Sequence, residues 1–229
     1  MMEVSSYPKT ALHIQSIGSQ GVLMGAKRRS LKKRSMKKKA TAKRAKVVVV
    51  GSKPVTDFRY PLGAFKLPKA PYSPEQHAVA IDEIEVTPKN LRAAVNGLTE
   101  AQLDTPYRPD GWTVRQVIHH LPDSHTQAYV RFKLALTEDV PTVGTYKEAR
   151  WAEQADSAAD VDVSLRMLES LHERWVYLLR RLDTAQWARR FNHPEYGEMG
   201  LDDLLAIYEW HGRHHIAHVT ELRKREGWE

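Results

Sequence analysis

Four long segments of the sequence carry apolar residues at helical spacing, and none alternates with period two for long enough to predict a sheet. The first has Ser73 as its expected N-cap and Pro74 at the first helical position, and Pro88 is expected to interrupt it. Thr113 is the expected cap of the second. We therefore predict an all-α four-helix bundle, because each apolar stripe must be buried against the others. The segments are 73–99, 110–138, 157–182 and 201–225.

The connections between these segments are marked by turn-forming residues. Residues 105–112 read TPYRPDGW and residues 190–200 read RFNHPEYGEMG, and both stretches are rich in Pro, Gly, Asn and Asp. Such clusters are typical of loops, so both stretches are predicted to be loops.

The net charge of +7 is unevenly distributed along the chain. Residues 1–46 hold 13 of the 35 basic residues and one of the 28 acidic residues, so they carry +12 and the remainder carries −5. Like-charge repulsion with little apolar surface to bury predicts a disordered tail over 1–56, followed by one domain over 57–229. Such a tail could contact polyanions without sequence preference. The alternatives are a solvated extension without a partner and a translation start site that was placed too early in the gene.

The absence of cysteine limits the chemistry that is open to this chain. Disulfides, thiolate ligands and a protein thiol nucleophile are excluded, so histidine and carboxylate are the remaining metal ligands. No stretch approaches the roughly 18 apolar residues of a membrane span, and no secretory signal is present. A cytoplasmic location is the expectation, with no membrane partner.

The fourth segment contains EWHGRHHIAHV, in which four of the 11 histidines fall within eight positions. A helical projection places His211 and His215 within roughly 20° of the apolar stripe and His218 within about 40° of it. His214 lies further round. Residues four apart lie one above the other on a helix, so His211 and His215 can converge on one metal ion.

A pair of histidines needs a further ligand, and the second segment offers three candidates in HHLPDSH. The straight-helix projection favours His125, places His120 on a flank and turns His119 away from the core. Pro122 lies between them and makes the helical phase unreliable. His172 of the third segment also faces the core, where a hydrogen-bonded structural role is expected for it.

Taken together, these residues resemble the DinB/YfiT-like family of metal-dependent hydrolases, in the branch related to bacillithiol and mycothiol S-transferases. The resemblance covers residues 58–228 and implies a four-helix bundle and a homodimer. It also implies a metal site of one histidine from the second helix and an H-x-x-x-H pair from the fourth, which are His120, His211 and His215 here. His125 stays the alternative second-helix ligand. The matching stretches are RYPLGAF, LDTPYRPDGWTVRQVIHHLPDSH, YVRFKLALTED, FNHPEYGEMGLDDLLAIYEWHGRHHIAHVTEL and the terminal GW.

Three imidazoles around Zn²⁺ leave one coordination position for water or a small-molecule substrate, which is typical of a catalytic site. Activation of that water predicts a hydrolase. The same position could instead activate an external low-molecular-weight thiol for an S-transferase, or the protein could be a non-catalytic metal-binding stress protein. An anion-binding function of the tail is a third class. Ni²⁺, Fe²⁺ and Mn²⁺ are alternatives to Zn²⁺.

Overall fold

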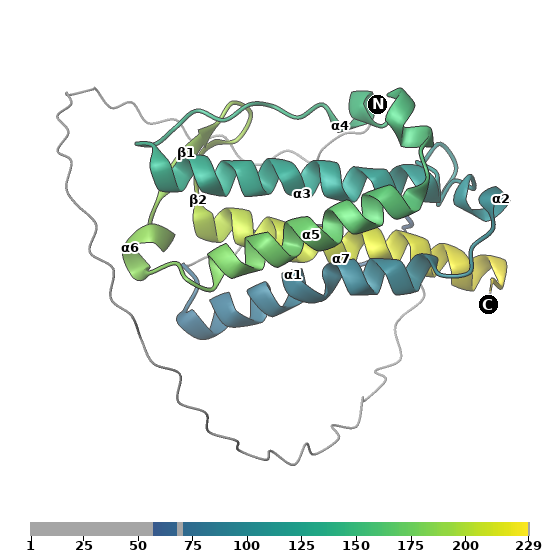
Figure 1. Cartoon of the computed structure of the whole chain (residues 1–229), viewed down its shortest axis with the longest axis horizontal. Coiled ribbons are helices and arrows are strands. Elements are labelled where there is room, and N and C mark those ends of the chain that lie inside the picture. Colours follow the sequence, from purple (N-terminus) through teal and green to yellow (C-terminus); the bar gives the residue numbers. More distant parts are fainter. Residues whose placement is uncertain (1–56, 68–70, 229) are drawn as a thin grey trace, which may run out of the picture. The chain divides into compact units, whose positions relative to one another are not determined.

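The computed structural model describes residues 57–67 and 71–228, in which four long helices form a bundle (Figure 1). This confirms the predicted four-helix bundle, whereas the predicted disordered tail over 1–56 lies outside the described residues. The long helices are α1 (Pro74–Val95), α3 (Val114–Thr137), α5 (Val161–Leu179) and α7 (Leu201–Glu226). The short elements are α2 (Glu100–Leu103), α4 (Glu148–Trp151), the 3-10 helix η1 (Ala155–Ala158), α6 (Thr184–Trp187), β1 (Arg190–His193) and β2 (Gly197–Gly200).

The helices are connected so that α3 and α5 run in the same direction, opposite to α1 and α7 (Figure 1). Arg180, after the last turn of α5, donates to Asp82 near the start of α1 at 2.7 Å, as antiparallel neighbours require. His119 and Ser164, both near the starts of α3 and α5, lie 2.7 Å apart, as parallel neighbours require. The connection 138–160 therefore returns along the length of the bundle before α5 begins.

The predicted helix starts are confirmed by their capping contacts. The side chains of Ser73 and Thr113 each accept a hydrogen bond from the third helical backbone N–H, and Pro74 occupies the first helical position. The predicted interruption at Pro88 is wrong, because α1 continues through it. Proline lacks an N–H and leaves the Ile84 carbonyl without its helical donor, but Nδ1 of His172 lies 2.7 Å from that oxygen and replaces it.

Residues 190–200 form a short β-hairpin, so the loop predicted over them is wrong, whereas the four-helix-bundle class of the fold is confirmed. β1 and β2 pair antiparallel, with Phe191 opposite Met199. Gly197 has φ +75°, which a side chain would strain at the turn. Phe191 is fully buried and anchors the hairpin in the core. A two-stranded ribbon this short leaves too few alternating positions for its pattern to be recognised in the sequence.

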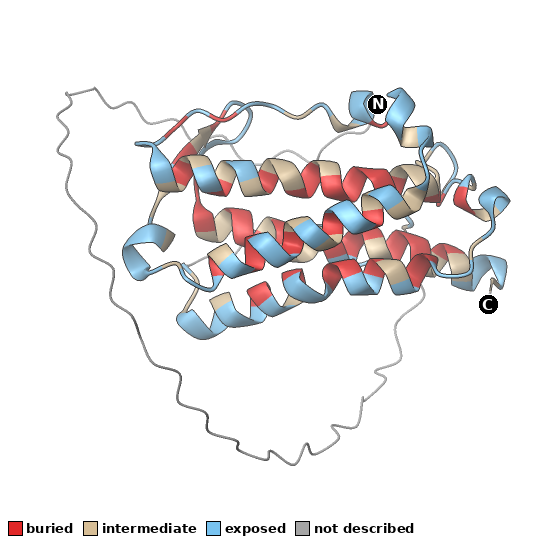
Figure 2. Ribbon diagram, viewed as in Figure 1, coloured by how far each residue is buried: buried red, intermediate tan, exposed pale blue. Residues whose placement is uncertain are grey.

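Two apolar clusters fill the bundle, with buried residues on the facing sides of the helices (Figure 2). One cluster includes Phe132, Trp175 and Leu204, and the other includes Leu121 and Leu168. On each long helix, the segment between the two clusters carries polar side chains. The site is built in this middle layer, which contains Thr87 of α1, His120, Ser124 and His125 of α3, His172 of α5, and His211, His214, His215 and His218 of α7.

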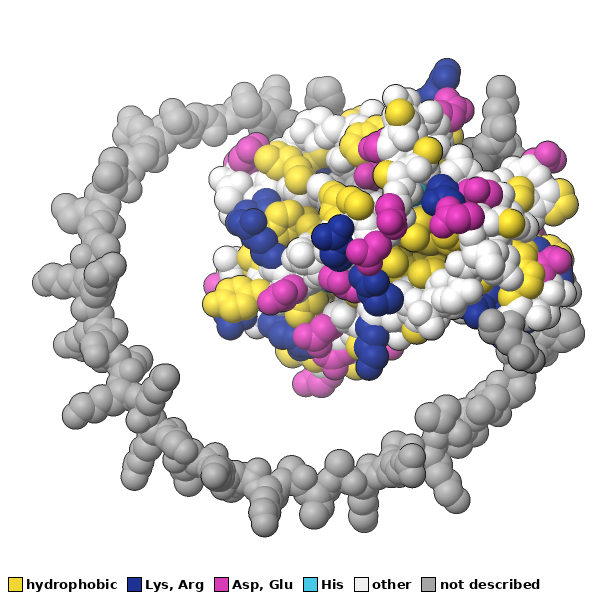
Figure 3. All heavy atoms as spheres, turned by 45° about the vertical axis from the view of Figure 1, so that its right-hand side comes forward, with side chains coloured by type: hydrophobic (Ala, Val, Ile, Leu, Met, Phe, Trp, Pro, Cys, Tyr) yellow, Lys and Arg dark blue, Asp and Glu magenta, His cyan; other side chains and the backbone are white. Residues whose placement is uncertain are grey.

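The surface carries charges of both signs, which are interspersed on the face drawn in Figure 3. Arg92 of α1, for example, donates to Asp162 at 3.0 Å and to Glu169 at 2.6 Å, both on α5. Such exposed pairs contribute little to stability individually, although they bridge the neighbouring helices α1 and α5. No helix in the described part of the chain has the length and apolar character that a membrane span requires.

Gly212 allows the close approach of α7 to α1 beside the histidines. A Cβ there would lie 2.8 Å from Cγ2 and 2.9 Å from Oγ1 of buried Thr87. We expect Gly212→Ala to lower the free energy of unfolding by about 1–2 kcal/mol, because overpacking outweighs the gain in helix propensity. Urea unfolding followed by circular dichroism measures this. Gly144→Ala is the control, since its Cβ would meet no atom within 4 Å; equal effects of the two substitutions would contradict the packing argument.

Candidate metal centre

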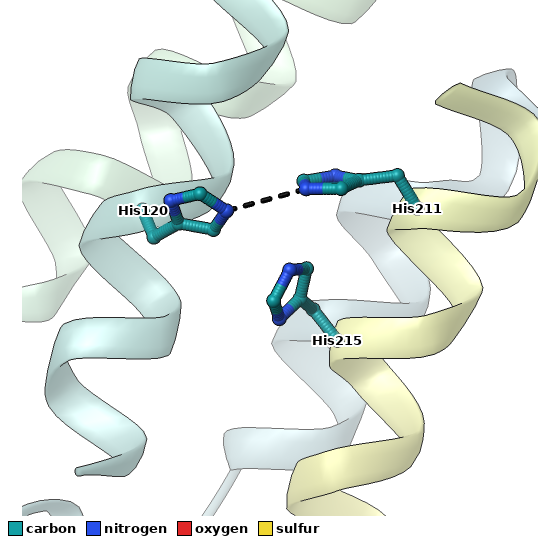
Figure 4. A group of neighbouring side chains, drawn as sticks. All are labelled: His120, His211 and His215. Atoms are coloured by element: carbon teal, nitrogen blue, oxygen red, sulfur yellow. Dashed lines mark hydrogen bonds between the residues drawn. The ribbon is translucent and has the colours of Figure 1, made fainter. Parts of the chain in front are cut away.

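His120 of α3 meets His211 and His215 of α7 in the middle layer (Figure 4). Each ring offers one nitrogen, and the three nitrogens all lie within 4.8 Å of one another. Nε2 of His120 lies 3.2 Å from Nε2 of His211. His211 and His215 are one helical turn apart and His120 approaches from the facing helix. The arrangement can therefore place three imidazole nitrogens around one cation.

Aromatic side chains surround this group. Trp112, just before the cap of α3, has its ring 4.7 Å from that of His120, and the ring of Tyr208 lies 5.4 Å from that of His211. The hydroxyl of Tyr146, from the connection 138–160, is 3.0 Å from Nδ1 of His120. Sequence reasoning missed Tyr146 because nothing in the pattern shows where a long connection returns.

Burial keeps the three imidazoles neutral. Desolvation lowers the pKa of His211 to about 3, and it lowers the pKa of His120 and of His215 well below 6.5, with the neighbouring histidines adding to each effect. Metals bind the neutral ring, so no proton must be displaced at neutral pH. In addition, Nδ1 of His215 is buried without a hydrogen-bond partner. The donor set therefore fits a metal ion that prefers nitrogen ligands.

His125 is fully buried, as the helical projection indicated, but it is not one of the three grouped histidines. Its Nε2 lies 3.1 Å from Nδ1 of His211, on the ring edge opposite the nitrogen that faces His120. Its Nδ1 lies 2.8 Å from Nε2 of His172. The hydrogen-bonded role expected for His172 is confirmed, and His125 shares it.

Two histidines that the projection turned away from the core are buried, with 6% of each exposed. His214 stacks on Trp210 at 4.1 Å, and Tyr60 of the segment 57–67 lies 6.2 Å away. His119 lies against the start of α5, where Ala159 accepts a hydrogen bond from its Nε2 at 3.2 Å. These placements were wrong because a single-helix projection cannot include what packs on its outer side.

His218, the fourth histidine of the cluster, is held by other contacts. Its Nε2 donates to the Arg59 carbonyl at 3.2 Å, and its ring stacks on Tyr107 at 4.0 Å. These contacts take up one ring nitrogen and one ring face. They fit a role in attaching the segment 57–67 to α7.

A sequence profile of the DinB superfamily matches residues 83–219. A protein of Bacillus cereus (strain 03BB102) named "Putative metal-dependent hydrolase" is 55% identical over 174 residues, which cover 76% of this chain and 100% of that protein. A Bacillus thuringiensis subsp. konkukian protein of the same designation has the same identity and coverage. The solved structure of YfiT from Bacillus subtilis, described as "a probable metal-dependent hydrolase with an unusual four-helix bundle topology", matches with a TM-score of 0.73 and 48% identity, covering 75% of this chain and 99% of YfiT.

Proposed function

Since this chain belongs to the DinB superfamily, we propose that it is a metal-dependent hydrolase whose metal is held by His120, His211 and His215. The observation that carries the proposal is the convergence of three neutral imidazole nitrogens within 4.8 Å. The naming of relatives as metal-dependent hydrolases supports the same class.

Zn²⁺ is the metal that we propose, because three imidazoles suit its tetrahedral preference and leave one position open. Ni²⁺, Fe²⁺ and Mn²⁺ are the alternatives. When bound, such an ion would act as a Lewis acid that lowers the pKa of a water molecule to about 7.

The protein's own residues exclude solvent and carry protons around the site. Trp112 and Tyr146 cover His120 from the α3 side and from the 138–160 connection. Asp123, one turn beyond His120, is half-buried, and desolvation raises its pKa to about 6. A carboxyl group with such a pKa exchanges protons near neutral pH. Asp123 interacts electrostatically with Tyr146, whose hydroxyl contacts His120, and on this basis we assign it the role of proton carrier.

Thiol transfer is the second candidate, because the same three histidines could hold a metal that activates a thiol. The chain has no cysteine, so that thiol would come from a low-molecular-weight cosubstrate. A metal-binding stress protein without turnover is the third. A homodimer, a cytoplasmic location and polyanion binding by residues 1–56 stay predictions.

The test of the proposed function is turnover of activated esters and amides by zinc-loaded protein. We expect hydrolysis that is lost on chelation and in His215→Ala, and that falls by about 10²-fold in Asp123→Asn with the metal still bound. Glu153→Gln, an exposed acid of the 138–160 connection, is the control for the loss of an acidic charge. Turnover only with an added thiol would establish the transferase instead, and metal binding without either reaction would leave the non-catalytic alternative.

A further inference from the structure

A line of hydrogen bonds runs through the middle layer from α1 to the proposed metal ligands. It starts at the Ile84 carbonyl, which has no helical donor because residue 88 is proline. Nδ1 of His172 lies 2.7 Å from this oxygen. A carbonyl oxygen only accepts, so Nδ1 of His172 carries the hydrogen.

The direction of the first bond fixes every later one. His172 is buried, and desolvation lowers its pKa to about 4, so the ring is neutral and its Nε2 is a lone-pair acceptor. Nδ1 of His125, 2.8 Å away, must therefore donate to it. That leaves Nε2 of His125 as an acceptor, 3.1 Å from Nδ1 of His211, which must donate in turn.

The line ends with Nε2 of His211 unprotonated and turned toward His120. This is the nitrogen within 3.2 Å of His120 Nε2, on the side where the three rings converge (Figure 4). Of the two tautomers of a neutral imidazole, only the one with the hydrogen on Nδ1 offers this lone pair to a metal.

We propose that His125 and His172 are positioning residues that hold His211 in its metal-binding tautomer, with the Ile84 carbonyl as their anchor. This role rests on the proposed function, because the tautomer of His211 has a functional consequence only when a metal binds there. Metal-bound histidines commonly donate their second N–H to such a partner. Here the partner is another histidine. The hydrogen bonds run from Ile84 of α1 to His172 of α5, then to His125 of α3, and end at His211 of α7.

His120 provides the contrast. Its Nδ1 partner is the Tyr146 hydroxyl, at 3.0 Å, which can either donate or accept. In the metal-free protein Nε2 of His120 donates to the lone pair on Nε2 of His211 at 3.2 Å. Because the Tyr146 hydroxyl on Nδ1 can donate or accept, His120 can change tautomer when a metal takes that lone pair, whereas the carbonyl at the far end of the line leaves one tautomer for His211.

Long-range ¹H–¹⁵N NMR of the zinc-free full chain at pH 7.5 tests the tautomers directly, without any variant. We expect His172, His125 and His211 all to carry the hydrogen on Nδ1. A hydrogen on Nε2 of His211 or of His125 in the wild-type protein would overturn the proposal.

Zinc affinity, measured by competition with a chromophoric chelator, tests the consequence. We expect His125→Leu to weaken binding about 10–100-fold, because Nδ1–H of His211 loses its acceptor. His125→Gln supplies an amide oxygen and an N–H in the same direction, and we expect it to restore most of the affinity. His119→Gln, on the same helix but outside the line, is the control. Equal weakening by leucine and glutamine would overturn the proposal in favour of simple packing.

The outcomes separate this inference from the proposed function. Nδ1–H tautomers in a protein that binds no zinc would support the hydrogen-bond line and contradict the metal site. Tight zinc binding that is unchanged in His125→Leu would support the metal site and overturn the positioning role.

Discussion

Alanine in place of His215 is expected to weaken the binding of the one metal ion per chain by about 10²–10³-fold, so that the ion is lost during gel filtration. Four-ligand zinc sites bind with about 10–16 kcal/mol, so one ligand contributes roughly 3–4 kcal/mol, or a factor of about 10²–10³ in affinity. His120→Ala and His211→Ala are expected to have losses of the same size, because each removes one of the three nitrogens that lie within 4.8 Å. Metal content after gel filtration, measured by plasma mass spectrometry on untagged protein, gives the result.

His214→Ala is the matched control for His215→Ala. The two histidines are neighbours on α7 and are buried to a similar degree, with 6% and 9% exposed, but only His215 is in the group. We expect His214→Ala to keep its metal even if it is less stable, since it loses ring contacts with Trp210, Tyr60 and two neighbouring histidines but none of the three grouped nitrogens. Metal loss in both variants would mean that disturbing α7, and not removing a ligand, is responsible. Metal retained in all three ligand variants would contradict the site.

The parts of this molecule that could be predicted from the sequence are those set by local rules. Ser73 and Thr113 begin helices because their hydroxyls accept from the first free backbone N–H groups, which depends on residues three positions away. The stripe that placed His211 and His215 inside the bundle likewise needs only the helical period. The grouping of His120 with them came from the family resemblance and not from the projection.

The parts that could not be predicted depend on partners distant in the sequence. Pro88 does not end α1, because His172, 84 residues later in the chain, supplies the donor that Ile84 lacks. His214 is buried because the segment 57–67 covers it, and Tyr146 reaches His120 from the return connection. In each case the local pattern could not show the neighbour that decides how the residue is placed.

The middle layer makes the metal-free fold sensitive to acid. Nine histidines have a pKa lowered by burial: His119 and His193 lie outside this layer, and the seven within it are His120, His125, His172, His211, His214, His215 and His218. In the unfolded chain each takes up a proton near pH 6.5, whereas the folded protein resists protonation until much lower pH. The unfolded state therefore binds more protons below pH 6.5, and the stability present above that pH is lost as the pH falls.

Each such group removes about 1.4 kcal/mol of stability per pH unit once its unfolded form is fully protonated, so seven together approach 10 kcal/mol per unit. That is comparable to the whole stability of a typical domain, about 5–15 kcal/mol. Asp123 and Glu209 act in the opposite sense, because burial raises the pKa of Asp123 to about 6 and that of Glu209 above its ordinary value, but together they offset at most two of the seven. We expect the chelated protein to unfold cooperatively between about pH 6 and pH 5.

Helicity at 222 nm followed against pH, with urea unfolding at pH 7.5, 6.5 and 6.0, measures both the transition and its proton uptake. We expect the free energy of unfolding to change with pH at a slope that corresponds to the uptake of at least four protons on unfolding. Zinc should move the transition to lower pH, because the ion binds only the folded form with neutral ligands. A slope of one proton or fewer, or stability that rises on acidification, would show that the middle layer is hydrated or already protonated. A dry, neutral layer of histidines is what the metal site and the line through His125 both require, so this measurement tests their common premise.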